Sequence, residues 1–159
     1  FPACHVHGVD GSGAMLGLAE AAANSADPVR ISYQLAYLPD PQLPHQHYDA
    51  VISNSLLHHL RDPLVLWDTI IQCGKPGAAV FIMDLLRPDT PVAAEQLVEL
   101  YAADEPEILK NDFFNSLLAA YLPSEVEAQM QQLGLTLKIE VVSDRHFIAF
   151  GRLPAAVSR

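Results

Sequence analysis

The stretch HVHGVDGSGAMLGLAEAAA, residues 5–23, contains an apolar segment, a Gly-Ser-Gly turn and a run of residues that favour helices. The apolar segment predicts a β-strand over about residues 3–9, and the alanine-rich run predicts a helix over about 13–23. Ser12 directly precedes that helix, where its hydroxyl can accept a backbone N–H of the first turn. The stretch therefore predicts a strand–turn–helix unit.

A single carboxylate, that of Asp10, stands at the tip of this turn. There it can accept two hydrogen bonds from a vicinal diol, such as the two hydroxyls of a ribose. The alternative is a second helix cap, because Asp is common at helix starts. Since Ser12 already fills the capping position, we favour the ribose interpretation.

Three further apolar runs predict strands, over about residues 29–34, 48–53 and 78–85. The run at 48–53 is expected to be buried. The strongly apolar run at 78–85 is typical of a strand whose sheet is covered on both faces. The proline-containing segments at 24–28 and 38–47 are predicted to be loops.

One helix is predicted between the last two of these strands. Asp62 can cap this helix, Pro63 suits its first turn, and it should end near Cys73. After the helix, the tripeptide Lys75–Pro76–Gly77 predicts a turn.

Residues 91–122 break the alternation, because two helices are predicted in succession. One apolar face of the first helix comprises Ala93, Leu97, Leu100 and Tyr101. The corresponding face of the second comprises Leu109, Phe113, Leu117 and Ala120.

The last part of the sequence predicts a helix and a β-hairpin. Ser124 and Glu127 have the spacing of a capping box, and Gly134 is expected to end the helix. The strands predicted at 135–143 and 146–152 are separated by only two residues, so they are expected to pair antiparallel.

These elements predict an α/β fold in which a mostly parallel sheet carries helices on both faces and ends in a C-terminal antiparallel hairpin. We expect a single domain over residues 1–159. Such sheets bind ligands at the carboxyl ends of their strands. Asp10, Leu35, Asn54 and Asp84 stand at or just after such ends, so we expect them to line one crevice.

Composition excludes several functional classes. The net charge of −10, without a basic stripe, argues against a nucleic-acid partner. The longest apolar runs are too short to span a membrane, so no membrane association is expected. Cys4 and Cys73 are isolated from each other, which is typical of a protein in the reducing cytoplasm.

Four stretches of the sequence carry a family resemblance: GVDGSGAML (8–16), YDAVISNSLLHHLRDP (48–63), KPGAAVFIMDLLRP (75–88) and GLTLKIEVVSDRHFIAFG (134–151). Together they resemble the class I S-adenosylmethionine-dependent methyltransferases, over nearly the whole chain, and the second stretch is the most specific. The resemblance implies a Rossmann-like fold with S-adenosylmethionine as cofactor. The sulfonium of that cofactor carries the chemical activation, so the protein mainly aligns the acceptor with the methyl group.

The resemblance also implies roles for individual residues near the cofactor. Asp10 would bind the ribose hydroxyls, while Gly11 and Ser12 would flank the adenosine. Asn54 and Ser55 would contact the methionine portion, largely through their backbone.

For the acceptor, the resemblance implies a helical lid inserted at about 89–122. The candidate substrate residues are Arg87, Tyr101, Phe113 and Phe114. The alternative for the two phenylalanines is a place in the core. The candidate catalytic residues are His59 and Asp84. Asp84 and Arg87 either bind substrate or cofactor or pair with each other.

The chain departs from the family pattern around the adenine. Many members carry a bulky apolar residue after the ribose-binding acid, where this chain has Gly11. Many also carry an acid after the next strand, where this chain has Gln34-Leu35-Ala36. The backbone of Leu35 or Ala36 is therefore expected to contact the adenine amine.

The largest departure is the lack of an N-terminal strand and of the GxGxG turn that follows it in the family. In the family strand order, 3-2-1-4-5-7-6, that strand lies between those predicted here at 3–9 and 48–53. Three arrangements are open: a segment outside this sequence supplies the strand, the two flanking strands pair with each other, or a second copy fills the gap. We favour a truncated chain that binds cofactor weakly or not at all and forms homo-oligomers, such as a homodimer, through its unpaired sheet edges.

The histidines form three sequence pairs, at positions 5 and 7, 45 and 47, and 58 and 59. With no HExxH motif and two distant cysteines, we expect no metal site. His58 and His59 are expected to cap and pack a turn, and His59 is also the candidate general base.

We therefore expect a cytoplasmic enzyme that transfers a methyl group from S-adenosylmethionine to a small-molecule acceptor, with impaired activity in this form. The alternative is a non-catalytic methyltransferase-like remnant or partner subunit. A dehydrogenase of the doubly wound type is a third hypothesis, against which the terminal antiparallel hairpin argues.

Overall fold

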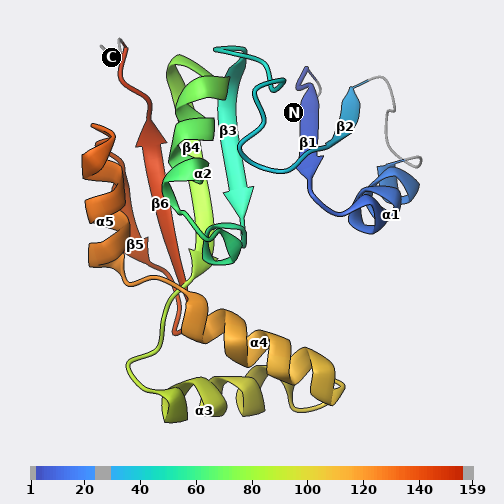
Figure 1. Cartoon of the computed structure of the whole chain (residues 1–159), viewed down its shortest axis with the longest axis vertical. Helices are drawn as coiled ribbons and strands as arrows, with labels where there is room; N and C mark the ends of the chain where they lie inside the picture. Colours follow the sequence, from blue (N-terminus) through green and yellow to red (C-terminus); the bar gives the residue numbers. More distant parts are fainter. Residues whose placement is uncertain (1–2, 24–29, 156–159) are drawn as a thin grey trace. The chain divides into compact units, whose positions relative to one another are not determined.

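Two β-sheets organise the chain, a two-stranded sheet and a four-stranded sheet (Figure 1). The computed structural model describes residues 3–23 and 30–155. The two-stranded sheet belongs to one compact unit, Phe1–Gln42, and the four-stranded sheet belongs to a second, Leu43–Arg159. The loop predicted at 24–28 and the first residue of the strand predicted at 29–34 lie outside the described residues.

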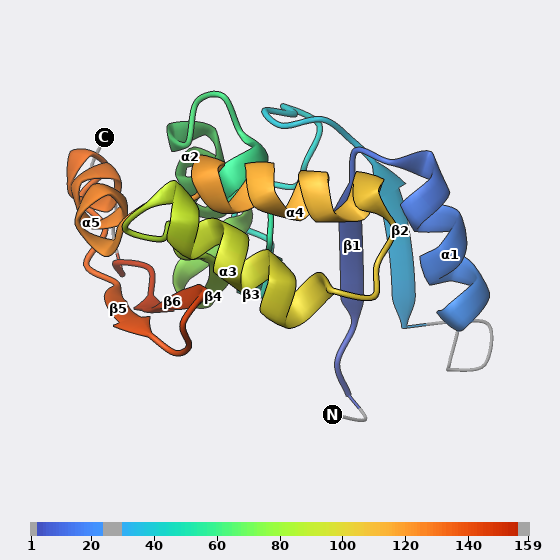
Figure 2. The same ribbon diagram turned by 90° about the horizontal axis from the view of Figure 1, so that it is seen from below.

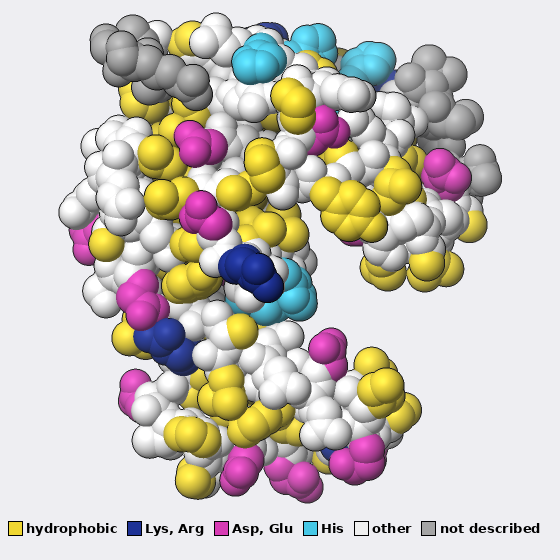
Figure 3. Space-filling view, viewed as in Figure 1, with side chains coloured by type: hydrophobic (Ala, Val, Ile, Leu, Met, Phe, Trp, Pro, Cys, Tyr) yellow, Lys and Arg dark blue, Asp and Glu magenta, His cyan; other side chains and the backbone are white. Residues whose placement is uncertain are grey.

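In the first unit, β1 (Val6–Asp10) pairs in parallel with β2 (Ile31–Leu35). The connecting helix α1 (Gly13–Ala23) starts as predicted, because the N–H of Met15 donates to Ser12 Oγ at 3.3 Å. No side chain of α1 is buried, and Figure 3 shows hydrophobic side chains over its surface.

In the second unit, the strand order is β3 (Tyr48–Asn54), β4 (Gly74–Leu85), β6 (His146–Arg152) and β5 (Lys138–Val141). The pair β3–β4 is parallel, whereas β4–β6 and β5–β6 are antiparallel. This confirms the α/β fold and its C-terminal antiparallel hairpin.

Each of the strands β1 and β3 has a partner strand within its own unit. Among the described strands, β1 pairs with β2 and β3 pairs with β4.

Two helices cover one face of the four-stranded sheet. They are α2 (Leu64–Cys73) and α5 (Pro123–Gln132), and the buried Trp67 Nε1 of the first donates to Gln129 Oε1 of the second at 3.0 Å. The N–H of Leu64 donates to Asp62 Oδ1 at 3.0 Å, so Asp62 caps α2 as predicted. The sheet side of this core comprises Val80, Ile82, Phe147 and Ala149, all buried.

The other face of the same sheet is partly exposed. Ile52 of β3 is 73% exposed and Phe81 of β4, its partner in register, is 42% exposed. The strand predicted at 48–53 is present, but the prediction that it is buried is wrong for the side chains on this face. Successive side chains of a strand point to opposite faces, and α2 and α5 cover the face opposite to Ile52.

The two successive helices predicted at 91–122 are α3 (Pro91–Ala102) and α4 (Glu107–Ala119), which lie side by side as a hairpin (Figure 2). Their shared core contains Leu85, Ala94, Leu117 and Ala120, with Leu97, Val98, Phe113 and Phe114 packed against it. Leu100 and Leu109 were predicted to face inward but are 67% and 49% exposed. In α3 the reason is that Ala94, rather than Ala93, faces α4, and one residue turns a helix by about 100°.

The start of β4 also differs from the prediction. The strand begins at Gly74, so Lys75–Pro76–Gly77 forms part of it and not a separate turn. Tyr48 lies opposite Gly74 while Ala50 lies opposite Ala79, so β4 holds extra residues here as a bulge. Gly77 has φ +78, a conformation that glycine adopts without strain.

The cap of α5 lies two residues earlier than predicted. The N–H of Leu122 donates to Glu125 Oε2 at 2.8 Å, so the capping box predicted for Ser124 and Glu127 is wrong. Pro123 occupies the first helical position, which proline favours. Gly134, with φ +70, ends the helix as predicted.

The hairpin is paired as predicted, but its first strand is shorter than 135–143. The N–H groups of Val142 and Ser143 both donate to the carbonyl of His146, which closes the chain into a wider turn. In the part of the chain that the structure describes, no helix is long and apolar enough to cross a bilayer.

Candidate functional site

The carboxyl edge of the first unit's sheet brings together the residues predicted around the adenosine. In the register of β1 and β2, Asp10 lies opposite Leu35, and the N–H of Ala36 donates to the carbonyl of Asp10 at 3.1 Å. Gly11 and Ser12 follow directly in the turn that leads to α1. Five predicted residues therefore occupy one edge of a small sheet: Asp10, Gly11, Ser12, Leu35 and Ala36.

The carboxylate of Asp10 is exposed and partly engaged by its own turn. Its Oδ1 accepts the N–H of Ser12 at 2.7 Å. None of the described residues donates to its Oδ2. The cap and ribose interpretations are thus compatible, because one oxygen orients the carboxylate and the other remains open to a ligand.

Tyr37 also lies at this edge, and sequence reasoning missed it. A Cβ atom added to Gly11 would lie 3.0 Å from Cε1 of Tyr37, so the ring rests against the glycine backbone. The signal in the sequence was the aromatic residue two positions after the end of β2, between the strand predicted at 29–34 and the loop predicted at 38–47.

In the second unit, the chain turns sharply after β3. Asn54 and Ser55 are exposed there, and a short 3-10 helix, η1 (Leu57–His59), follows. Ser55 has φ +52, which is uncommon for a residue with a side chain. Its N–H donates to the carbonyl of Met83 at 2.9 Å, so the turn is tied to β4.

Asp84 holds this turn from the end of β4. The side chain is 1% exposed, and its Oδ2 accepts the N–H groups of Leu56 at 2.9 Å and Leu57 at 2.7 Å. Its Oδ1 lies 2.5 Å from Nδ1 of His58 and also accepts the N–H of Leu85 at 2.8 Å. An ionised carboxylate can only accept, so Nδ1 of His58 carries the proton.

The charge of Asp84 is set by competing effects. Burial raises the pKa of its carboxyl group, but the hydrogen bonds from His58, Leu85 and Leu57 outweigh burial and leave the pKa below its ordinary value. The group is therefore a carboxylate near neutral pH, with its oxygens engaged by the protein.

His59 is the more accessible of the two adjacent histidines. Its ring lies 4.0 Å, centroid to centroid, from that of His58. Burial lowers its pKa and His58 lowers it further, while Asp84 and Asp112 act in the opposite direction. The imidazole is therefore neutral near pH 7 and can accept a proton.

The residues predicted to bind substrate are not gathered in one place. Arg87 forms an ion pair with Glu125, with Nη2 and Oε1 2.7 Å apart, so Arg87 and Asp84 do not pair with each other. The hydroxyl of Tyr101 donates to Asp144 Oδ2 at 2.7 Å, and the guanidinium of Arg145 lies 3.4 Å from its ring centroid.

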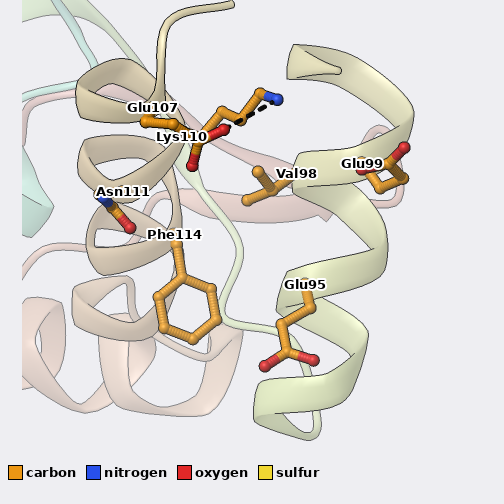
Figure 4. Close-up of a pocket in the computed structure, with 7 residues that line it drawn as sticks. All are labelled: Glu95, Val98, Glu99, Glu107, Lys110, Asn111 and Phe114. Carbon is orange, nitrogen blue, oxygen red and sulfur yellow. Dashed lines mark ion pairs between the residues drawn. The ribbon is translucent and has the colours of Figure 1, made fainter.

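A pocket of about 290 Å³ opens between α3 and α4. Of the predicted substrate residues only Phe114 lines it, and Figure 4 shows this ring in the space between α4 and α3. Most of the lining residues are of charged or polar types, and together they are Glu95, Val98, Glu99, Glu107, Lys110, Asn111 and Phe114. Acidic side chains are also visible along this hairpin in Figure 3.

The histidine pairs do not build a metal centre in the described ranges. Within residues 3–23 and 30–155, no group of three His, Cys, Asp or Glu side chains lies close enough to hold an ion.

A family model described as a methyltransferase domain matches residues 1–82 of this chain. No curated protein matches its sequence.

Solved structures share the fold. A SAM-dependent methyltransferase from Aquifex aeolicus is 16% identical with a TM-score of 0.69, and the match covers 94% of this chain and 69% of that one. Phosphoethanolamine N-methyltransferase 2 from Haemonchus contortus, in complex with S-adenosyl-L-methionine, is 21% identical with a TM-score of 0.65. That match covers 87% of this chain and 29% of the other. An O-methyltransferase family protein from Burkholderia thailandensis is 16% identical with a TM-score of 0.68, and the match covers 97% of this chain and 45% of the other. The chain thus spans less than half of the last two proteins, and at these identities the likeness establishes the fold.

Proposed function

Because the chain belongs to the family of methyltransferase domains, we propose that it transfers the methyl group of S-adenosylmethionine to a small-molecule acceptor. The family match over residues 1–82 carries this proposal. The cofactor supplies an activated methyl group, so the protein's task is to bind and orient the two reactants. The solved structures with this fold include one N-methyltransferase and one O-methyltransferase family protein, so the acceptor atom is left open.

For the adenosine portion, the first unit offers a suitable set of groups. The free Oδ2 of Asp10 is suited to the ribose hydroxyls. The backbone of Leu35 and Ala36 lies beside it and is suited to the adenine amine.

For the methionine portion, the second unit offers the exposed turn at Asn54 and Ser55. The hydrogen bonds from this segment to Met83 and Asp84 hold it in one conformation. His59 follows in η1, and we propose that its neutral imidazole removes the proton of the acceptor.

Replacement of Asp10 tests the cofactor assignment. Asp10→Ala should weaken S-adenosylhomocysteine binding by about 1–3 kcal/mol, because charge-assisted hydrogen bonds to the ribose are lost. Isothermal titration calorimetry on the whole chain measures the change, and Glu20→Ala, an exposed acid of the same unit, is the control. Asp10→Asn keeps a side-chain oxygen that accepts the Ser12 N–H but removes the negative charge. It therefore distinguishes the effect of the turn from the effect of binding the ribose. Unchanged affinity in Asp10→Ala would refute the assignment.

The reaction itself is tested by incubating the chain with S-adenosylmethionine and a panel of small alcohols, amines and thiols. Formation of S-adenosylhomocysteine above the Asp10→Ala background is the expected result. The alternative function is a non-catalytic remnant or partner subunit. Absence of both product and cofactor binding would support that alternative, and tight stoichiometric binding would contradict the expected impairment.

We also propose a cytoplasmic homo-oligomer, for which the exposed apolar side chains on one face of the four-stranded sheet offer a surface in addition to the sheet edges expected from the sequence. Ile52, Phe81 and Phe150 lie in one row across this face, and exposed apolar patches of this kind mark association sites. On β5, Lys138 continues this row next to Phe150, and Glu140 lies two residues further along the strand, so two copies can match lysine to glutamate about a two-fold axis.

A charged residue on this face should prevent the association. Ile52→Lys is expected to shift the chain to monomer, because the lysine would have to be desolvated between two sheets. Ile108→Lys is the matched control, since Ile108 of α4 is 76% exposed and Ile52 is 73% exposed. Sedimentation velocity measures both variants, and a parent chain that is monomeric at high concentration would refute the proposal.

A further inference from the structure

We propose that Tyr37 forms the surface on which the adenine ring of the cofactor stacks, at the position where Gly11 carries no side chain. This inference rests on the proposed function and assigns a base-binding residue within the first unit.

The ring of Tyr37 combines exposure with a defined support. It is 75% exposed, although large aromatic side chains are usually well buried. On one side it rests against Gly11, where an added Cβ would meet Cε1 at 3.0 Å and Cδ1 at 3.1 Å. Any larger residue at position 11 would displace the ring, so the glycine and the tyrosine form a matched pair.

The backbone beneath the ring is also held. The N–H of Ala36, the residue before Tyr37, donates to the carbonyl of Asp10 at 3.1 Å. This bond extends the β1–β2 pairing by one residue past Leu35. The tyrosine therefore leaves the sheet from an anchored position and not from the middle of a loop.

The neighbourhood of the ring matches the two halves of a nucleoside. Asp10 precedes Gly11 and has an oxygen open to a sugar diol, while the ring offers a flat apolar surface to a base. Leu35, opposite Asp10 in register, is 57% exposed and adds apolar surface at the same edge. Aromatic side chains that stack on bases typically change affinity about five- to a hundredfold when removed.

Titration of the whole chain with S-adenosylhomocysteine, followed by saturation-transfer NMR, tests the inference because this method detects weak binding. Tyr37→Ala should raise Kd about tenfold or more and reduce transfer to the adenine H2 and H8 protons relative to the ribose H1′ proton. Tyr37→Phe should behave as the parent, since stacking needs the ring and not the hydroxyl. Leu18→Ala, which removes a 67% exposed apolar side chain of the same unit, is the control.

The outcomes separate the inference from the function on which it rests. If the parent chain binds no S-adenosylhomocysteine, the proposed function fails and the inference fails with it. If the parent binds and Tyr37→Ala has an unchanged Kd and an unchanged transfer pattern, only the role of Tyr37 is refuted. If Tyr37→Phe loses as much affinity as Tyr37→Ala, the hydroxyl is responsible and stacking is refuted.

Discussion

Asp84→Ala is expected to lower the free energy of unfolding by about 3–5 kcal/mol, because several donors lose one buried carboxylate at the same time. The substitution removes the acceptor for the N–H groups of Leu56, Leu57 and Leu85 and leaves Nδ1 of His58 without its carboxylate. Buried donors without acceptors destabilise the fold, because they have lost their hydrogen bonds to water and form none within the protein. Chemical denaturation followed by circular dichroism measures the change.

Asp89→Ala is the control for this prediction, because Asp89 is an exposed acid close by in sequence. A change of about 0.5 kcal/mol or less is expected there. The pH dependence gives a second check. The pKa of Asp84 is lowered in the folded chain, so its stabilising effect is complete above the unfolded pKa and is lost as the pH falls through the folded value. The gap between parent and Asp84→Ala should therefore narrow in acid, and a gap that widens there would contradict this account.

His59→Gln is expected to reduce kcat by about 10²–10⁴-fold with any acceptor that must lose a proton, as for other general bases. Glutamine keeps the polarity of the side chain but cannot take up a proton at neutral pH. His59 is exposed at the surface, so the fold should survive the change. The rate of S-adenosylhomocysteine formation measures the effect, and His45→Gln, another exposed histidine, is the control.

The pH profile distinguishes a base from a structural residue. Because the pKa of His59 is lowered, the parent should keep its activity down to a pH below the ordinary histidine value of about 6.5 and lose it below that. This acid limb should be absent in His59→Gln. An acid limb that persists in the variant, or a kcat equal to that of the parent, would rule out His59 as the base.

Both predictions concern the segment after β3, of which the sequence revealed only part. The run YDAVISNSLLHHLRDP marked this segment as the most specific of the chain. The pattern placed Asn54, Ser55 and the two histidines at the end of a strand. It could not assign Asp84 to His58, because the two residues are separated by 26 positions.

The residues at the carboxyl edge of the β1–β2 sheet were also predicted only in part. Asp10 and Ser12 were assigned from a turn of a few residues, and the structure places them with Leu35 and Ala36 at one sheet edge. Tyr37 was missed because its importance depends on Gly11, which is distant in sequence and adjacent only through the pairing of β1 with β2.

The sequence by itself determined the elements whose ends depend on neighbouring residues. Ser12 and Asp62 cap their helices, Gly134 ends another, and the terminal strands pair as a hairpin. These interactions act over a few residues, so they leave a pattern that can be read locally.

Only the tertiary structure decided which surfaces are covered and which distant groups meet. It showed that α2 and α5 leave Ile52 and Phe81 exposed, that Ala94 rather than Ala93 faces α4, and that Arg87 pairs with Glu125. Strand register and helix rotation set these contacts, and a rotation of a single residue exchanges an inward side chain for an outward one. Packing between segments far apart in the chain makes that choice, and a local sequence pattern contains no information about such packing.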